Sequence, residues 1–561
     1  MILRAKTIIF IILIFLKQEL KLFIDAILKN KPKFKDLNSK QNDYKIFSKF
    51  SYTKKTKDKI LVTSFLGIND YLKYEYLLGI YLSEIEKKNI IILLEENDSI
   101  SKNFFLTKGL NNFIYFKSKP NFYKRLIYQL KSFLLISKFK DIEDFVKFKL
   151  DGIPTGKVIY SHVSRFSRVP TFNHINAKFY NAFAIYLHFR EEFKNILSKN
   201  NIKYFIQSEP QFIPPAIFMG YALKKKIRMI SRIGNNKIIS IRNVNSVRNF
   251  HESRWKYDKK FFHIIKRNHK SKAIKIGKKI LEDRLEGRNQ PDKDIDIEGI
   301  KLAKIRNIKF VENYNKKIIC KYFKWDVSKP IGAIFANDLT DGLFTNKWGI
   351  YRDNYTWLKE VLNYASKNEK VNWIVKSHPS DLKNDSKHKT KHLFERNIYP
   401  DNIKFLPENW GRKKLHKVVN IIFTNYGSAG YEYPALGIPA VISSESHYYG
   451  LNIAYETHTT KELEKIIMIS HRIKKLKKKV SNNAKIFIFL ENNFTKTKID
   501  LATLDHVYED TNSESYWEDY IRNYRKTNIY KSSSLNKDEF YKTFRYQIKK
   551  KLKHCINKKY I

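Results

Sequence analysis

Cysteine is nearly absent from this sequence of 561 residues, in which only Cys320 and Cys555 occur. Neither lies at metal-ligand spacing from another cysteine or a histidine, so the sequence predicts neither a disulfide scaffold nor a zinc site. Two isolated thiols fit a reducing cytoplasm. Apolar runs of the ~20 residues that a membrane-spanning helix requires are also lacking, which argues against an integral transporter or polymerase.

Acidic residues are scarce relative to basic ones: 55 Asp and Glu against 108 Lys and Arg give a formal net charge of +53. Nucleic-acid binding would concentrate the basic residues beside a recognisable module. Here they are spread along the chain without such a signature, so no specific nucleic-acid partner is expected. Two explanations stay open. One is attraction to anionic lipid, at about 1 kcal/mol per basic residue near the surface. The other is a general drift toward the residues of A/T-rich codons.

The length and the apolar content predict a folded protein of more than one domain. A chain of 561 residues exceeds what a single hydrophobic core usually serves. Hydrophobic residues make up 43% of the sequence, with 35 Tyr and 40 Phe, which excludes disorder throughout. We therefore expect two domains with appendages.

The N-terminus carries a short apolar run, residues 8–16, behind Arg4 and Lys6. No small-residue cleavage site precedes the polar residues that follow, so a cleaved signal peptide is not expected. Beyond the run, apolar residues recur at helical spacing: Leu16, Leu20, Phe23 and Ile27. This pattern predicts an amphipathic helix that lies in a membrane interface or packs on the protein's own core.

Two series of apolar runs alternate with helical stretches. In the first half the runs predict strands at residues 60–66, 89–94, 113–116, 204–206 and 228–230. In the second half they predict strands at residues 332–336, 372–376, 404–406, 419–424 and 440–442. The strand–helix–strand rhythm is typical of parallel, doubly wound sheets. Residues 250–320 are charged and mostly helical, and we interpret them as connecting structure.

Loops that follow strands are the candidate site, because α/β proteins bind ligands there. The first such loop begins at Lys376 and Ser377 and continues into His378 and Pro379. A histidine fixed by the following proline, with Lys and Ser beside it, can donate to phosphate oxygens and neutralise a leaving group. The alternative interpretation is a polar turn with a stabilising histidine.

The second loop, residues 424–432, joins a strand to a helix. Its exposed backbone N–H groups and a hydroxyl at a helix N-terminus predict an anion site. The candidate phosphate-binding residues are Asn425, Gly427, Ser428, Ala429 and Gly430. Glu432, in the first helical turn, is either a ribose-binding acid or an acid favoured by the helix dipole. The loop lacks the Walker Gly-Lys-Ser/Thr ending, so ATP hydrolysis is not indicated.

Two further loops carry weaker signals. Asp338 and Asp341 follow the first strand of the second half and can supply a general base for an attacking hydroxyl, although such a run often forms an Asx turn. Residues 151–160 form a turn-rich lead into an apparent strand in the first half. The order and spacing of all four loops together give them more weight than each has alone.

Together these segments resemble bacterial capsular and surface polysaccharide biosynthesis glycosyltransferases. The resemblance rests on residues 334–336 with Asp338 and Asp341, on Trp357-Leu358, and on residues 373–379, 427–432 and 437–439. Residues 448–450 and 459–462 are also similar to that family, and residues 152–156 and 208–210 more loosely so. The similarity spans about residues 60–470 and is strongest over 331–465.

The resemblance implies a GT-B-like α/β fold, with two Rossmann-like domains facing a cleft and the nucleotide-sugar donor held mainly by the second. The His-Pro element is similar to that of transferases that use CMP-activated acidic sugars such as sialic acid and Kdo. By this resemblance His378 contacts the donor phosphate, Ser428 and the 427–430 backbone cradle it, and Asp341, with Asp338 beside it, is the base. Such enzymes hold the phosphate without a metal, so we expect no metal and no cofactor.

We therefore expect five regions: an N-terminal membrane-proximal helical segment (1–50), an N-terminal acceptor domain (51–250), a helical connecting region (251–330), a C-terminal donor domain (331–465) and a basic helical C-terminal region (466–561). The expected partners are a nucleotide-sugar and a polysaccharide or lipid-linked acceptor, with the anionic inner-membrane surface as a further candidate. The expected location is the cytoplasm, peripheral at the inner membrane.

Other functions fit parts of the same pattern. A UDP- or GDP-sugar transferase would keep the fold and the cleft. A CDP-polyol phosphotransferase would transfer a phosphate ester in place of a sugar. A non-catalytic membrane-binding or polyanion-binding protein on a transferase fold would bind anionic lipid or RNA in a salt-sensitive way and have no affinity for a donor.

Overall fold

A computed structural model describes residues 56–65, 69–107, 110–233, 238–247, 259–286, 311, 313–343, 349–378, 381, 389–407, 409–410, 412–498 and 538–560. The amphipathic helix predicted at residues 8–27 lies outside the described residues, as does Pro379. Within the described ranges, no helix combines the length and the apolar character that crossing a bilayer requires.

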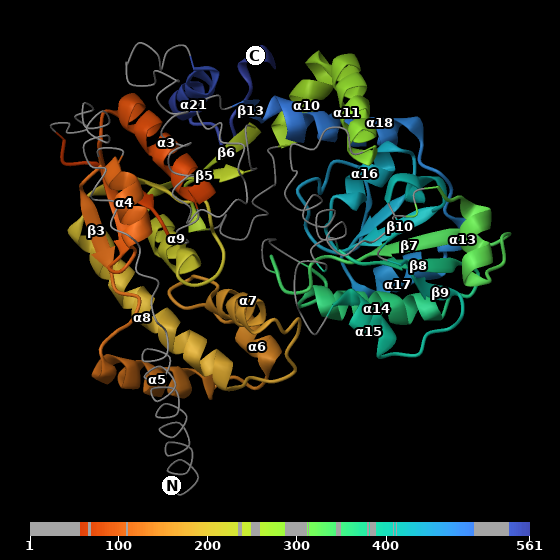
Figure 1. Cartoon of the computed structure of the whole chain (residues 1–561), viewed down its shortest axis with the longest axis horizontal. Helices are drawn as coiled ribbons and strands as arrows, with labels where there is room; N and C mark the ends of the chain where they lie inside the picture. The colour runs from red at the N-terminus through yellow and green to blue at the C-terminus, as the bar shows by residue number, and fades with distance from the viewer. Residues whose placement is uncertain are drawn as a thin grey trace, which may run out of the picture.

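The N-terminal domain is built on a seven-stranded sheet with the order β13-β6-β5-β4-β1-β2-β3 (Figure 1). Five strands are parallel: β1 (Lys59–Thr63), β2 (Asn89–Glu95), β3 (Phe113–Phe116), β4 (Ile202–Ile206) and β5 (Arg228–Ile233). β6 (Ile238–Val244) is antiparallel to β5, and β13 (Thr497–Lys498) is antiparallel to β6. The central strands are apolar and buried on both faces, as parallel sheets require.

Seven helices of the described chain accompany this sheet: α3 (Asn69–Glu86), α4 (Ser99–Thr107), α5 (Phe122–Ile136), α6 (Ile142–Lys147), α7 (Thr155–Ser167), α8 (Ala177–Lys199) and α9 (Pro215–Lys224). The prediction of a strand at the end of the 151–160 segment is wrong, because Val158 and Tyr160 belong to α7. The buried positions Gly156, Tyr160 and Val163 recur every three or four residues, which only a helix places on one face. A three-residue apolar run does not distinguish the two structures.

The C-terminal domain is built on a six-stranded, fully parallel sheet with the order β12-β11-β10-β7-β8-β9. Its strands are β7 (Ile331–Phe335), β8 (Asn372–Lys376), β9 (Ile403–Phe405), β10 (Ile421–Thr424), β11 (Ala440–Ile442) and β12 (Tyr455–Glu456). Its helices include α13 (Lys316–Phe323), α14 (Asn354–Ser366), α15 (Thr390–Glu395), α16 (Ala429–Ala435) and α17 (Thr460–Met468). The parallel strands at the centre of the first sheet and throughout the second confirm the predicted class of two Rossmann-like α/β domains. The predicted region boundaries remain predictions.

The described chain beyond residue 470 packs first on the C-terminal domain and then on the N-terminal domain. α18 (Lys478–Phe489) and the π-helix η7 (Leu490–Phe494) pack with α11 (Lys270–Leu285) and α16 against the C-terminal domain. Gly277 lets α11 approach closely, because a Cβ there would lie 2.0 Å from the Lys485 carbonyl oxygen. β13 then joins the N-terminal sheet, and α21 (Glu539–Lys549) packs on α3 (Figure 1). The described parts of the basic C-terminal region are thus integral to both domains.

Candidate functional site

The order of the C-terminal sheet reverses between β7 and β10, and such switch points bind ligands in open parallel sheets. The loops that leave these two strands lie side by side. The Asn337 side-chain oxygen accepts hydrogen bonds from the Asn425 backbone N–H at 3.3 Å and from the Thr424 hydroxyl at 3.2 Å. The candidate loops predicted after these strands therefore meet at the switch point.

Asn425 organises this edge. Its side-chain nitrogen donates to Asn354 at 2.8 Å, and its side-chain oxygen accepts from the Ser444 hydroxyl at 2.6 Å. Asn354 in turn donates to the Asp338 carbonyl at 2.6 Å. With both polar atoms engaged and the side chain buried, Asn425 holds three loops together, which makes it a positioning residue at the predicted phosphate site.

The two acids of the β7 loop differ in their surroundings. The Asp338 carboxylate accepts from the backbone N–H groups of Thr340 at 2.9 Å and Asp341 at 3.1 Å. This is the Asx turn that the sequence offered as the alternative. Asp341 is partly exposed, and its carboxylate lies 3.7 Å from the Arg165 guanidinium of α7, in the N-terminal domain. Asp341 is therefore the acid of this loop that faces the other domain.

His378 follows β8 at the same edge, and its carbonyl accepts from the backbone N–H of Asp381 at 3.0 Å. Burial raises the pKa of Asp381, the nearby charge of Asp338 adds to the effect, and His378 opposes it. His378 and Asp338 thus both lie within electrostatic reach of Asp381. Ser377 and Lys376 are half-buried beside them, and the Lys376 carbonyl accepts from the Ala336 N–H at 3.0 Å.

The 427–430 loop is shaped by Tyr448. The Tyr448 hydroxyl donates to the Gly427 carbonyl at 2.8 Å, and a Cβ on Gly430 would lie only 1.8 Å from the same hydroxyl. Glycine is therefore required at Gly430 by close approach. Ser428 is exposed at the start of α16 and makes no capping bond there, with the half-exposed Ala429 next to it. The loop presents the Ser428 hydroxyl at the edge predicted to bind phosphate.

Glu432 lies in a buried ion cluster that the sequence did not predict. Its carboxylate is 2.7 Å from the Arg284 guanidinium, and the two side chains are 11% and 14% exposed. The neighbouring Tyr431 hydroxyl donates to Glu491 at 2.8 Å, and His447 lies 3.2 Å from the same carboxylate. The cluster fixes α11 and η7 against the start of α16. The predicted contact between Glu432 and a ribose remains a prediction.

The N-terminal sheet has its own switch point, between β1 and β4. There the carboxyl of Glu75, on α3, accepts from the backbone N–H of Ser208 at 2.9 Å. The side-chain oxygen of Gln207 is buried and makes no hydrogen bond within the described part of the chain. Glu75 lies inside a helical stretch and 133 residues before Ser208, so no sequence pattern marked it.

Substitution of Glu75 is expected to change how stability depends on pH. Burial raises the pKa of Glu75 to about 8, although the Ser208 bond and the Arg232 charge oppose this. Because the unfolded carboxyl titrates near ~4.3, the folded chain binds the extra proton between these values, and stability falls as the pH rises from about 4.5 to 8. Glu75→Gln should remove this fall and stabilise the protein at pH 8 by about 1–3 kcal/mol.

Thermal melting of the wild type and Glu75→Gln at about pH 5, 6, 7 and 8 measures this effect, because these pH values cover the interval between the unfolded and the folded pKa of Glu75. Glutamine keeps an oxygen that can accept from Ser208. Parallel melting curves for the two proteins over the whole range would contradict the assignment.

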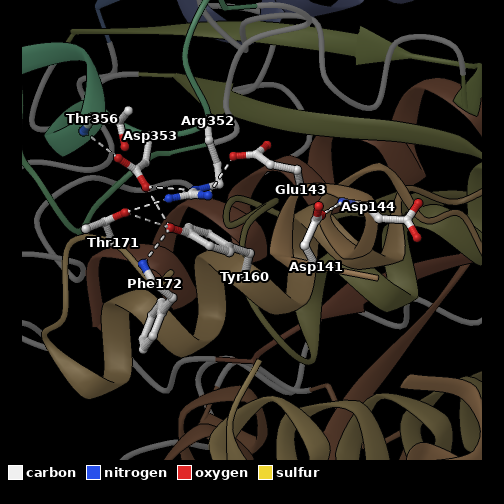
Figure 2. Close-up of polar contacts among 9 residues, drawn as sticks. All are labelled: Asp141, Glu143, Asp144, Tyr160, Thr171, Phe172, Arg352, Asp353 and Thr356. Atoms are coloured by element: carbon white, nitrogen blue, oxygen red, sulfur yellow. Dashed lines mark hydrogen bonds and ion pairs between the residues drawn. The ribbon is translucent and has the colours of Figure 1, made fainter. Parts of the chain in front are cut away.

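The two domains meet through α7 and the start of α14 (Figure 2). The Tyr160 hydroxyl donates to Asp353 at 2.6 Å, and Asp353 also caps α14 by accepting from the Thr356 N–H at 2.7 Å. Arg352 reaches across to Glu143 at 2.6 Å and to Thr171 at 3.0 Å. Asp353 is completely buried, and Arg352 nearly so. This junction lies beside the Arg165–Asp341 contact and fixes the candidate edge relative to α7.

No protein-family model matches the sequence, and no curated protein matches it. Among solved structures, the chain is similar to the Thermosulfurimonas dismutans KpsC beta Kdo 2,4 transferase, with 12% identity over 54% of this chain and 83% of that chain and a TM-score of 0.29. It is also similar to the beta Kdo 2,7 transferase of the same KpsC, with 11% identity, coverage of 66% and 96% and a TM-score of 0.31.

A third similar structure is Anabaena Alr3699/HepE in complex with UDP-glucose, with 10% identity over 77% of this chain and 95% of that chain and a TM-score of 0.27. At these identities and scores, the similarity concerns the coarse fold and carries no argument about activity. The case for a function therefore rests on the residues at the edge of the C-terminal sheet.

Metal-ligand geometry gives a separate observation. Across the described ranges, no group of three or more His, Cys, Asp or Glu side chains is arranged to hold a metal ion. The Asp338 carboxylate bonds to its own loop, and the Asp381 carboxylate accepts from the Thr390 N–H at 3.1 Å.

Proposed function

We propose that the protein is a glycosyltransferase of surface polysaccharide biosynthesis, which transfers a sugar from a nucleotide-activated donor to a glycan or lipid-linked acceptor. One observation carries the proposal: the loops after β7, β8 and β10 leave the same edge of the C-terminal sheet, at and next to its switch point. This supports a site in which His378, Asp341 and the 427–430 loop act on one ligand at an edge next to the N-terminal domain.

The proposed reaction is a single displacement. Asp341 accepts the proton of an acceptor hydroxyl while the hydroxyl oxygen attacks the anomeric carbon. The bond from that carbon to the phosphate oxygen breaks, and the phosphate leaves with the electron pair. His378, Ser428 and the backbone of the 427–430 loop stabilise the departing charge. Asp338 orients the loop that carries Asp341, as its two bonds to that loop suggest.

For the donor we propose a CMP-linked acidic sugar and a reaction that needs no divalent cation. The support is the Lys376-Ser377-His378 segment at the carboxyl end of β8, on the same edge of the sheet as the 427–430 loop. We further propose that the protein works in the cytoplasm, peripheral at the inner membrane, where a lipid-linked acceptor is presented.

Calorimetric titration of the full chain with CMP, CDP, UDP and GDP, in buffer containing EDTA, tests the donor assignment. We expect CMP to bind most tightly. His378→Ala should weaken that binding, because the phosphate loses a hydrogen-bond donor. His458→Ala is the matched control, since His458 is an exposed histidine of the same domain and follows the edge strand β12.

The other outcomes identify the alternatives. Preference for UDP or GDP would replace the CMP-sugar assignment but keep the transferase. Preference for CDP, followed by phosphorus in the transferred product, would indicate a polyol phosphotransferase. No nucleotide binding by a folded protein would overturn the proposal in favour of a non-catalytic binder of membranes or polyanions.

A further inference from the structure

Helix α5 has two apolar faces, and one of them packs on the described part of the N-terminal domain. Tyr128, Ser132 and Ile136 are buried, and α5 packs on α8. Other large apolar side chains of the same helix point outward: Tyr123 is 76% exposed, Ile127 47% and Leu134 62%. Figure 1 shows α5 at the margin of the N-terminal domain, with α8 between it and the sheet.

Helix geometry makes the exposed side chains a continuous stripe. Successive residues turn by about 100°, so Tyr123, Ile127 and Leu134 fall within a narrow sector on the side of the helix opposite to Ser132. The half-exposed Leu130 lies in the same sector, between Ile127 and Leu134. The stripe therefore points away from the core. Scattered exposed apolar residues are normal, but an ordered stripe of this kind indicates an interaction surface.

The charged residues of the segment that carries the stripe are all basic. Between residues 117 and 140 the sequence contains seven basic residues and no acidic residue: Lys117, Lys119, Lys124, Arg125, Lys131, Lys138 and Lys140. All six of these lysines are exposed. Lys124 and Lys131, seven residues apart, lie along one side of the stripe. The acids nearby come from other segments, such as Glu191 of α8, which pairs with Lys124 at 3.0 Å.

We propose that this face of α5 docks on an anionic lipid bilayer. The helix lies in the plane of the interface, with Tyr123, Ile127 and Leu134 at the boundary between headgroups and acyl chains and with the lysines at the lipid phosphates. Aliphatic side chains beside a tyrosine and a row of lysines are the composition of an interfacial helix. Each lysine held near an anionic surface adds to the attraction.

Charge favours lipid over the other occupants. A second copy of this face would bring its own basic residues against those of the first, and like charges repel. Nucleic acid would pair with the lysines but gains little from exposed Ile127 and Leu134. An anionic bilayer satisfies both the apolar stripe and the basic border. This inference rests on the peripheral membrane location in the proposed function and names the surface that makes the contact. It can be tested separately from the transferase activity, because lipid binding needs neither the donor nor the C-terminal site.

Flotation of the full chain with phosphatidylcholine vesicles, with and without phosphatidylglycerol, tests the proposal. The wild type should bind the anionic vesicles and be released by salt. Ile127→Ser combined with Leu134→Ser should weaken this binding by about tenfold or more, because the apolar contact is lost. Lys131→Gln combined with Lys138→Gln should also weaken binding and reduce its dependence on salt. Ile398→Ser, at a fully exposed site of the C-terminal domain, should bind as the wild type does.

Both α5 variants should keep the melting temperature and the nucleotide affinity of the wild type, since the altered side chains are exposed. Vesicle binding by the Ile127/Leu134 variant equal to that of the wild type would overturn the proposal. The proposal would also be overturned if light scattering gave the variant half the molecular mass of the wild type while lipid binding stayed unchanged. The stripe would then be a contact between two copies of the chain. His378→Ala should bind vesicles as the wild type does even if it no longer binds nucleotide. The two proposals can therefore fail independently of each other.

Discussion

Replacing His378 with alanine should lower kcat/KM for sugar transfer by about 10²–10³-fold. In other enzymes, the loss of one preorganised hydrogen-bond donor to a developing charge has an effect of this size. The reason is that charge builds on the leaving phosphate only as the bond to the anomeric carbon breaks. The decrease should therefore fall on kcat more than on KM. Steady-state transfer measured with the donor that binds in calorimetry checks the effect.

Two features make this result interpretable. The His378 backbone carbonyl accepts from the Asp381 N–H, and alanine keeps this carbonyl, so the substitution should leave that hydrogen bond intact. Asp341→Asn should likewise lower kcat because it removes the base, and it should leave nucleotide binding unchanged. Full turnover by His378→Ala would remove this residue from the mechanism.

Replacing Asp353 with alanine should destabilise the folded chain by about 2–4 kcal/mol. The change removes the N-cap of α14, which typically contributes ~1 kcal/mol, and leaves buried donors of Arg352 and Tyr160 without their acceptor, at about 1–3 kcal/mol. Urea unfolding followed by circular dichroism measures the shift. Asp353→Asn can still cap the helix, so it should cost less.

A double-mutant cycle isolates the bond between the domains. Tyr160→Phe removes only the hydroxyl that donates to Asp353 and accepts from the Phe172 N–H. Because Tyr160 and Asp353 touch, the double variant should be more stable than the sum of the single effects predicts, by about 1 kcal/mol. Strict additivity would mean that the hydrogen bond across the junction does not couple the two domains.

The sheet strands could be predicted because a buried parallel strand is apolar on both faces and ends in turn-forming residues. Residues 90–94 and 373–375 are of this kind, and they lie in β2 and β8. The run at residues 158–160 was too short to separate strand from helix. Tertiary packing determines the helical structure of this segment. Gly156 of α7 lies against the Phe145 carbonyl, and a Cβ on Gly156 would be 1.9 Å from that oxygen.

The candidate site could be predicted in part, since strand-end loops are local in sequence and meet at one edge of the sheet. The partners of the site residues are distant in sequence and could not be predicted. Glu432 pairs with Arg284, 148 residues earlier, and Asp341 faces Arg165 of the other domain. Such contacts depend on how the domains and the C-terminal helices pack against one another. Local sequence patterns do not predict this packing.

The return of the chain to the N-terminal sheet has a consequence for biosynthesis. β6 is covered on its outer edge by β13, and α21 packs on α3 of the same domain. Residues 245–496 are therefore synthesised after β6 and before the strand that pairs with its edge. Until then the nascent chain carries an open β-edge, the kind of surface that invites pairing with other chains and is shielded by chaperones.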